Sequence, residues 1–245
     1  NIILFLLLLP LMAYGQTYKH IGVEDGLSNR RIYNIQKDHQ GYMWFLTNEG
    51  MDRYNGKDIK HYKLIEENKQ LSSEIHLGWL YADKEGGIWV IGKKGRIFQY
   101  EEKYDRFTMV YKSPKVTDAI SYGYLDRNNN LWLCGKDSIL LYNTKTTQVM
   151  RLPNLLEDNI TVVEQADDTH FFIATEMGVR YTQFENEALK VLDHVYTQIN
   201  SLYFHPQLHR LFVGTFSDGT FAYDMSAHQI IKSDTKLGDV SITHI

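Results

Sequence analysis

The stretch Asp38-His39-Gln40-Gly41-Tyr42-Met43-Trp44 decides the fold, because the chain repeats its frame twice. The second copy is Asp83-Lys84-Glu85-Gly86-Gly87-Ile88-Trp89, and the third is Asp126-Arg127-Asn128-Asn129-Asn130-Leu131-Trp132. Phe172 and Phe212 take the place of Trp in two weaker copies, so the aromatic marker recurs at spacings of 45, 43, 40 and 40 residues. Self-similarity at such a period indicates a repeat architecture.

Each repeat predicts four short antiparallel strands. In the first repeat we expect strands at residues 32–36, 44–46, 51–54 and 59–63, separated by turns rich in Asp, Asn and Gly. One four-stranded sheet cannot bury both of its faces, so it must stack on copies of itself, with the large aromatics filling the wedge between neighbours. The sequence therefore predicts an all-β fold, a β-propeller of four-stranded antiparallel blades.

The repeat count predicts about five blades and the start of a sixth. A ring needs its last blade to meet its first, so we expect an incomplete part of a seven-bladed ring; a strained five-bladed ring is the alternative. The expected blade limits are residues 30–72, 73–116, 117–157, 158–196 and 197–238, with a partial blade at 239–245.

The N-terminus predicts export. An apolar run at residues 2–12 ends in Ala13-Tyr14-Gly15, which is typical of a signal peptide, so residues 1–15 are expected to be its remnant and residues 16–245 an N-terminal propeller domain. A buried core strand and an uncleaved anchor are the alternatives. The single Cys134 excludes an internal disulfide framework and lies in an apolar stretch typical of a buried strand.

The charge balance argues against nucleic-acid binding in this segment. The chain has 26 basic and 30 acidic residues and a formal net charge of −4. No basic field that could attract a phosphate backbone is evident.

The first repeat resembles a known family. Asp25-Gly26-Leu27-Ser28-Asn29, the Asp38, Gly41 and Trp44 frame, and Arg53-Tyr54-Asn55-Gly56 resemble the two-component regulator propeller repeat. The second and third repeats keep the Asp, Trp and Tyr skeleton. Departures include Asn129 at the place of Gly41, and Pro206 where the fifth repeat should have Asp.

The resemblance implies the periplasmic sensor region of a hybrid two-component histidine kinase from Bacteroides-type bacteria. It implies a propeller that senses glycan-derived oligosaccharides or another small periplasmic ligand and thereby controls polysaccharide-utilisation genes. We expect a homodimer, membrane attachment only through a downstream transmembrane helix, and an inner-membrane location for the whole protein. A related architecture joins the propellers directly to a DNA-binding domain, and a protein-interaction propeller and an exported glycosidase or lyase are further alternatives.

Catalytic and metal-binding patterns are weak in this segment. Asp38, Asp83 and Asp126 resemble the Asp-box of sialidase-type propellers, but a structural turn residue is the favoured interpretation. His205 and His209 are four residues apart, yet Pro206 places them in a turn and not on one helix face. No catalytic residue, metal site or cofactor is therefore expected.

A binding face follows from connectivity. Strands alternate in direction, so the turns between second and third strands share one end of the propeller with the connections between blades, and ligands bind where loops converge. A mixed-charge ring of this kind suits an oligosaccharide. The candidate ligand-binding residues at this end are Arg31, Asn48, Glu49, Lys94, Asp137 and Glu176.

Overall fold

The computed structural model describes residues 18–66, 69–70, 78–114, 119–156, 158–195, 199–215, 219–226 and 229–232. They form five four-stranded antiparallel sheets and one two-stranded sheet. The all-β class and the four-stranded blades are thus confirmed. The expected signal peptide at residues 1–15 and the partial blade at residues 239–245 lie outside the described residues.

The strands of each sheet follow one another in chain order as a simple meander. Their bounds, sheet by sheet, are β1 (Ile32–Lys37), β2 (Met43–Thr47), β3 (Gly50–Tyr54) and β4 (Ile59–Tyr62); β7 (Trp79–Ala82), β8 (Ile88–Gly92), β9 (Arg96–Glu101) and β10 (Arg106–Lys112); β11 (Ile120–Leu125), β12 (Asn130–Gly135), β13 (Ser138–Asn143) and β14 (Val149–Pro153); β15 (Ile160–Gln165), β16 (His170–Thr175), β17 (Gly178–Glu185) and β18 (Ala188–Val195); β19 (Ile199–His205), β20 (Arg210–Thr215), β21 (Thr220–Asp224) and β22 (Gln229–Lys232). The small sheet pairs β5 (Ile65–Glu66) with β6 (Lys69–Gln70), and the 3-10 helices are η2 (Val23–Asp25), η4 (Glu102–Tyr104) and η5 (Pro206–Leu208).

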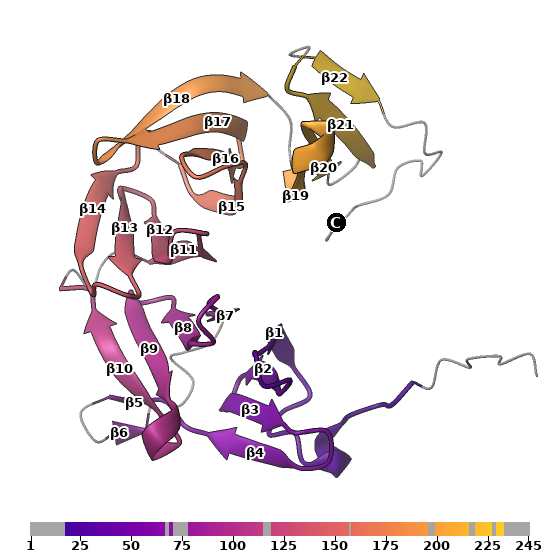
Figure 1. The fold of residues 1–245 in the computed structure, drawn as a ribbon, viewed down its shortest axis with the longest axis vertical. Coiled ribbons are helices and arrows are strands. Elements are labelled where there is room, and N and C mark those ends of the chain that lie inside the picture. Colours follow the sequence, from indigo (N-terminus) through magenta and orange to yellow (C-terminus); the bar gives the residue numbers. More distant parts are fainter. Residues whose placement is uncertain are drawn as a thin grey trace, which may run out of the picture.

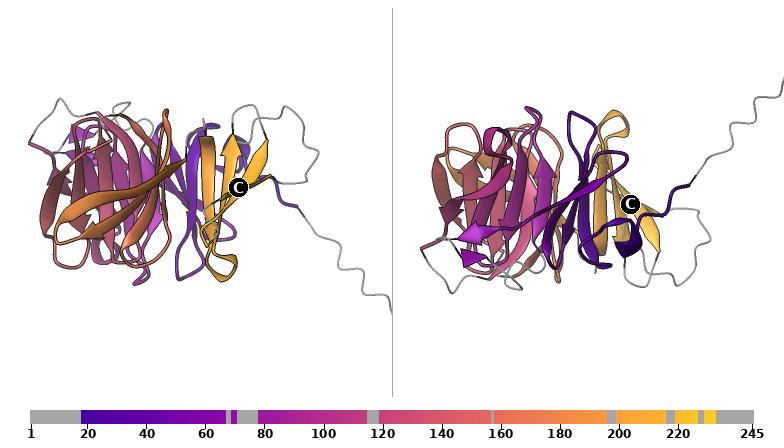
Figure 2. Two further views of the ribbon diagram at one scale, coloured as in Figure 1. Left: turned by 90° about the horizontal axis from the view of Figure 1, so that it is seen from above. Right: turned by 90° about the horizontal axis from the view of Figure 1, so that it is seen from below.

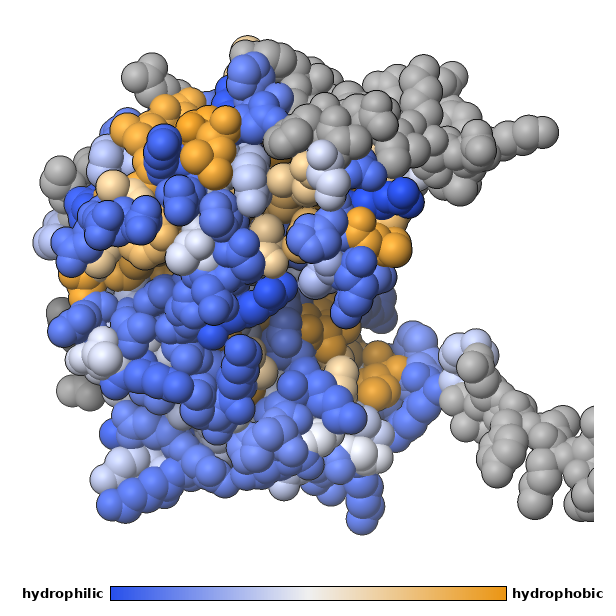
Figure 3. All heavy atoms as spheres, turned by 45° about the horizontal axis from the view of Figure 1, so that its top comes forward, coloured by the Kyte–Doolittle hydropathy of each residue, from blue (hydrophilic) through white to orange (hydrophobic). Residues whose placement is uncertain are grey.

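The five sheets stand as blades around a common axis (Figure 1). The first strand of each blade is innermost, and β1, β7, β11, β15 and β19 contact one another in that order along an arc. Seen edge-on, the strands run from one end of the molecule to the other, and the turns lie at both ends (Figure 2). The face of the molecule shown in Figure 3 is mainly hydrophilic, with hydrophobic patches between the polar side chains. Within the described part of the chain, no helix has the length and apolar character needed to cross a membrane.

The aromatic markers fill the wedges between blades. Trp44, Trp89 and Trp132 are 0%, 2% and 0% exposed, as predicted. Each packs with the following blade: Trp44 lies in one cluster with Leu80 and Phe98 of the second blade. Burying about 200 Å² of indole surface at about 25 cal/mol per Å² contributes about 5 kcal/mol for each Trp.

In the first three repeats an Asp closes the turn between the first two strands. Asp38 Oδ1 accepts the backbone N–H groups of Gln40 and Tyr42 at 3.0 and 2.9 Å, while its Oδ2 accepts Nε1–H of Trp44 at 2.7 Å. Asp83 and Asp126 make the equivalent bonds to Trp89 and Trp132 at 2.7 and 2.9 Å. The structural interpretation of these three Asp residues is confirmed.

The weaker repeats show what replaces this bond. In the fourth blade Phe172 is 1% exposed at the marker position and has no N–H to donate. Among the described residues, the Asp167 carboxylate contacts only its own turn: it accepts from the backbone N–H groups of Thr169 and His170 at 2.9 Å each and from the Thr169 hydroxyl at 3.3 Å, and it lies 2.9 Å from His170 Nδ1. In the fifth blade the 3-10 helix η5 takes the place of the Asp turn.

Left-handed turn positions explain one departure from the repeat. Gly41 and Gly86 adopt φ of 90° and 89°, and Asn129 holds the same place in the third blade at φ 65°. Asn tolerates this region better than other side chains, so the turn survives the loss of Gly.

Candidate functional site

The turns between second and third strands gather at one end of the propeller, with the connections between blades, because the strands alternate in direction. We call this end the loop end, and the other the turn end. All six candidate residues lie at the loop end, so connectivity places them together as expected, while their role in binding stays a prediction. Their places are Arg31 directly before β1, Asn48 and Glu49 between β2 and β3, Lys94 between β8 and β9, Asp137 between β12 and β13, and Glu176 between β16 and β17.

Buried side chains at the ends of the strands stabilise the loop-end turns by hydrogen bonds to the turn backbone. Thr47, 3% exposed, accepts the Glu49 backbone N–H on Oγ1 at 3.1 Å and donates to the Gly50 carbonyl at 3.2 Å. Gly50 has a φ of 126°, and a Cβ there would lie 2.5 Å from the Tyr62 carbonyl oxygen, so the tight turn requires Gly. The side chains of Asn48 and Glu49 are left on the outer side of a fixed backbone.

Arg31 and Asn48 meet through Tyr33, which was not among the candidates. The Tyr33 hydroxyl donates to Asn48 Oδ1 at 2.6 Å, and the Arg31 guanidinium lies 5.8 Å from the centre of the Tyr33 ring. Asn29 Oδ1 accepts the Arg31 backbone N–H at 2.8 Å. The first blade therefore presents a cation, an aromatic ring and an amide in one cluster. The signal for Tyr33 in the sequence is its position two residues after Arg31, at the start of an innermost strand.

Lys94, Asp137 and Glu176 lie exposed in separate turns of successive blades. Backbone contacts fix two of these turns: Asn154, 5% exposed, donates its backbone N–H to the Asp137 carbonyl at 3.1 Å. Its Nδ2 donates to the carbonyls of Gly135 and Lys136 at 3.0 and 2.9 Å. The Ile120 N–H donates to the Lys93 carbonyl at 2.7 Å in the same manner. The loop end is thus a set of rigid turns, each carrying one or two polar side chains.

The segment before β1 is attached to the first blade by a buried carboxylate. Asp52, 0% exposed, accepts from the backbone N–H and hydroxyl of Ser28 at 2.8 and 2.9 Å on Oδ2, and its Oδ1 lies 2.7 Å from His61 Nδ1. Leu27, which precedes Ser28 in the chain, is 4% exposed. The Asp25-Gly26-Leu27-Ser28 motif therefore builds scaffold, and it fixes the backbone that leads to Arg31.

A cluster of charges and aromatic rings lies between the first two blades at the turn end. Asp105 accepts from Lys60 Nζ and from the hydroxyls of Tyr62 and Tyr100, at 2.7 Å for each hydroxyl. Burial opposes ionisation, but these hydrogen bonds lower the pKa of Asp105 to about 2, and burial raises the pKa of Tyr62. Arg53 lies among four rings and donates to Tyr100 at 2.8 Å. The rings around Arg53 come from both of the first two blades, so the cluster joins these blades.

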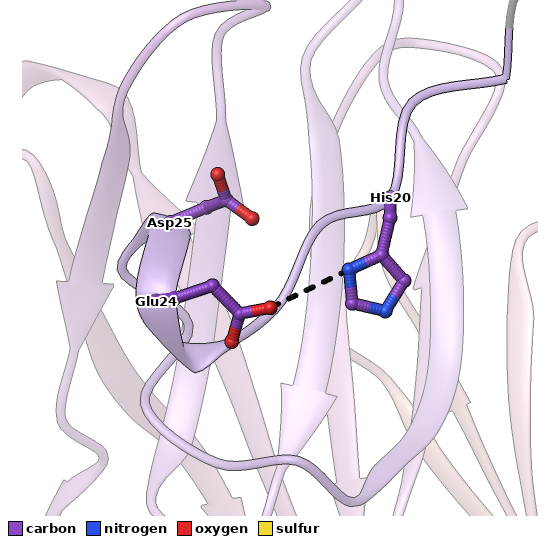
Figure 4. A group of neighbouring side chains, drawn as sticks. All are labelled: His20, Glu24 and Asp25. Carbon is purple, nitrogen blue, oxygen red and sulfur yellow. Dashed lines mark ion pairs between the residues drawn. The ribbon is translucent and has the colours of Figure 1, made fainter.

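One group of side chains could offer three ligands to a metal ion, although no metal site is expected from the sequence. The donor atoms of His20, Glu24 and Asp25 all lie within 4.8 Å of one another. Figure 4 shows the three side chains next to one another at the start of the chain's described part. All three are exposed; Glu24 pairs with His20 at 3.5 Å, and Asp25 Oδ2 accepts the Gly22 N–H at 2.9 Å. These contacts explain the arrangement as the cap of η2. His205 and His209 flank η5, and neither joins such a group within the described residues.

Fold and loop end together define the class, a β-propeller of four-stranded blades whose fixed turns present polar side chains at one end. Within this class, residues 26–49 match the family described as Two component regulator propeller. The resemblance predicted from the first repeat is thereby confirmed for the first blade. A comparison with curated protein sequences gives no match.

Solved structures share the fold at low sequence identity. The extracellular domain of BT3049 of B. thetaiotaomicron, described as a hybrid two component system, is 17% identical with a TM-score of 0.62, and the match covers 92% of this chain and 38% of that one. The extracellular domain of BT4673 of the same organism, described as a one component system, is 16% identical with a TM-score of 0.66, over 89% and 31%. Sqt1 of Saccharomyces cerevisiae is 14% identical with a TM-score of 0.63, over 86% and 64%. The chain spans about a third of the two B. thetaiotaomicron chains.

Proposed function

We propose that this chain is part of the periplasmic ligand-sensing propeller of a hybrid two-component regulator. The observation that carries the proposal is the match of residues 26–49 to the regulator propeller family. Two fold relatives are extracellular domains of proteins described as two component or one component systems, which supports the same role. Such a propeller transmits a signal when its ligand binds one of two conformational states more tightly than the other.

The proposed ligand is an oligosaccharide derived from a glycan, bound at the loop end. Arg31, Tyr33 and Asn48 supply a cation, a ring face and an amide in one cluster, and Glu49 adds a carboxylate from the same turn. Hydroxyl groups of a sugar can both donate to and accept from such side chains, while a ring face packs on the apolar side of a pyranose. The rigid turns beneath reduce the ordering cost of binding.

The remaining parts of the proposal concern the whole protein. We place a signal peptide at residues 1–15, a seven-bladed ring completed by further blades, a homodimer, and an inner-membrane attachment through a downstream transmembrane helix. The output is a histidine kinase that regulates polysaccharide-utilisation genes; direct fusion to a DNA-binding domain is the alternative output.

Titration calorimetry on the complete extracellular region tests the proposal. The region is titrated with a panel of plant and host glycan oligosaccharides, and a ligand is expected to bind saturably. Arg31→Ala and Asn48→Ala should each weaken binding about tenfold, the effect of losing one hydrogen bond that involves a charged or well-ordered group.

Lys57→Ala is the matched control, because Lys57 is an exposed cation in the turn between β3 and β4, at the turn end. It should leave the affinity unchanged. Absence of any binder in the panel would refute oligosaccharide sensing, and turnover of a bound glycan would favour an enzyme instead.

A protein partner at the loop end is the second candidate function. Met177, between β16 and β17, and Leu155, after β14, are 64% and 55% exposed at this end. Large apolar side chains exposed beside polar turns are typical of protein-binding surfaces. Met177→Ser should abolish capture of such a partner while leaving oligosaccharide binding unchanged.

A further inference from the structure

A groove lies at the turn end between the third and fourth blades, away from the loop end. It encloses about 430 Å³, which lies within the range of small-molecule sites. The third blade contributes the start of β12, the end of β13, the turn that follows and the start of β14; the fourth contributes Phe184 and Glu187.

The β17–β18 hairpin, which forms one wall of the groove, is longer than the corresponding hairpin of the third blade. Both strands have eight residues, against six and five for β13 and β14. Its far end reaches the third blade: the Phe184 ring packs edge-on to Trp132 at 6.1 Å, and Leu189, 4% exposed, joins the same cluster. Asn186 and Glu187 close the hairpin at φ of 51° and 59°, the conformation of a tight two-residue turn. One wall is therefore a rigid hairpin anchored by two apolar side chains.

The opposite wall is equally fixed. Asn143 Oδ1 accepts the backbone N–H groups of Lys145 and Thr146 at 3.1 and 3.0 Å, and its Nδ2 donates to Asn130 Oδ1 at 2.8 Å. Asn130 Nδ2 in turn donates to Asp126 Oδ2 at 2.8 Å. These bonds orient two amides at the groove before any ligand arrives, which lowers the cost of binding.

The lining indicates the ligand's chemistry. Leu141, Met150 and Phe184 give an apolar floor, while Gln148 and Glu187 lie on the two walls. Within the described part of the chain, neither Gln148 nor Glu187 makes a side-chain hydrogen bond or ion pair, so both can serve a ligand. Among the residues that the structure describes, no Lys or Arg lines the groove, and nearby Lys145 is paired with Glu85 at 2.5 Å.

We propose that this groove binds a neutral, polyhydroxylated ligand of disaccharide size. Hydroxyl groups match walls that offer both donors and acceptors, and the C–H face of a sugar ring matches the apolar floor. The Glu187 carboxylate, without a lining cation, disfavours an anion. The site is separate from the loop end and does not depend on the function proposed there.

Calorimetry on the complete chain with maltose and cellobiose tests this site, with digalacturonate as the anionic counterpart. Saturable binding of a neutral disaccharide is expected, with digalacturonate at least about tenfold weaker because it faces Glu187. Gln148→Ala and Glu187→Gln should each weaken binding about tenfold. Val149→Trp, which fills the groove from an exposed position, should abolish binding without removing a polar group.

The control is Lys57→Ala, an exposed position in the first blade that belongs to neither candidate site, and it should not alter binding at this groove. Circular dichroism confirms that each variant is folded. The proposal is overturned if neither neutral disaccharide binds, if digalacturonate binds as tightly, or if binding survives Val149→Trp. Loss of binding in Asn48→Ala alone would also overturn it, and would instead support the loop-end site.

Discussion

The bond between the Asp turn and the marker Trp can be measured in the third blade. The Asp126 carboxylate accepts four hydrogen bonds, from the backbone N–H groups of Asn128 and Asn130 at 2.8 Å each, from Asn130 Nδ2 at 2.8 Å, and from Trp132 Nε1 at 2.9 Å. Asp126→Ala removes all four acceptor contacts. It leaves the Trp132 N–H unpaired in a place where the indole is 0% exposed.

The magnitude follows from these contacts. A buried donor without a partner costs about 1–3 kcal/mol, and each turn N–H that loses its acceptor costs about 0.5–1.5 kcal/mol. With one buried indole donor and two turn N–H groups, Asp126→Ala should therefore lower the free energy of unfolding by about 2–6 kcal/mol. Trp132→Phe removes only the N–H donor and part of the ring volume. In a double-mutant cycle the two changes should couple by about 1.5–3 kcal/mol, the contribution of a hydrogen bond to a charged acceptor.

Urea unfolding followed by circular dichroism gives the four free energies of the cycle. The fourth blade supplies the control, because Asp167 bonds only its own turn and Phe172 has no N–H. The cycle of Asp167→Ala with Phe172→Leu should show coupling near zero. A coupling below about 0.5 kcal/mol between Asp126 and Trp132 would refute the interpretation that the Asp turn holds the wedge.

Three further predictions concern single groups. The pKa of Asp105 is lowered from 3.8 to about 2 in the folded chain, so its ionised form stabilises the fold above about pH 4. This contribution is lost as the pH falls toward 2, and thermal unfolding measured as a function of pH should show the loss. The Asp105→Asn variant should lack this pH-dependent loss of stability. Asn129→Val should lower the free energy of unfolding by about 1–3 kcal/mol in urea, whereas Asn129→Gly should be close to neutral, since the position has a φ of 65°. The Cys134 thiol is 0% exposed and burial raises its pKa, so it should react with a thiol reagent only in denaturant; fast labelling of the native chain would contradict the placement of β12.

The repeat made the blades predictable. Two constraints act together at each copy: a carboxylate that closes a turn, and an indole six residues later that both fills a wedge and donates to that carboxylate. Such a pair fixes residue types and spacing, so it is visible in one sequence. The fourth copy lacks this pair, because Phe172 has no N–H to donate and Asp167, five residues before it, accepts from its own turn; only the buried aromatic ring is kept.

For the candidate site, the order and alternating direction of the strands predict only at which end of the propeller each turn lies. Alternating strand direction placed Asn48 and Glu176 at the same end, but no periodic constraint acts on exposed turn residues. The contact of Tyr33 with Asn48 could not be predicted from the sequence, because it depends on the register of β1 and β2, which shifts between Ile32 and Asn34. One wall of the groove between the third and fourth blades is the β17–β18 hairpin, whose Asn186-Glu187 turn lacks the Gly that marks most tight turns.

Each marker Trp packs against the blade that follows it in the chain, and this has a consequence for how the number of blades can change. Each marker Trp is encoded in one blade but completes the hydrophobic layer of the next, as Trp44, Trp89 and Trp132 do in turn. A duplicated segment of about 40 to 45 residues therefore carries both the Trp that packs against the next blade and the hydrophobic surface that receives the Trp of the preceding blade. Gene duplication can add or remove a whole unit without new interface residues having to arise at the same time.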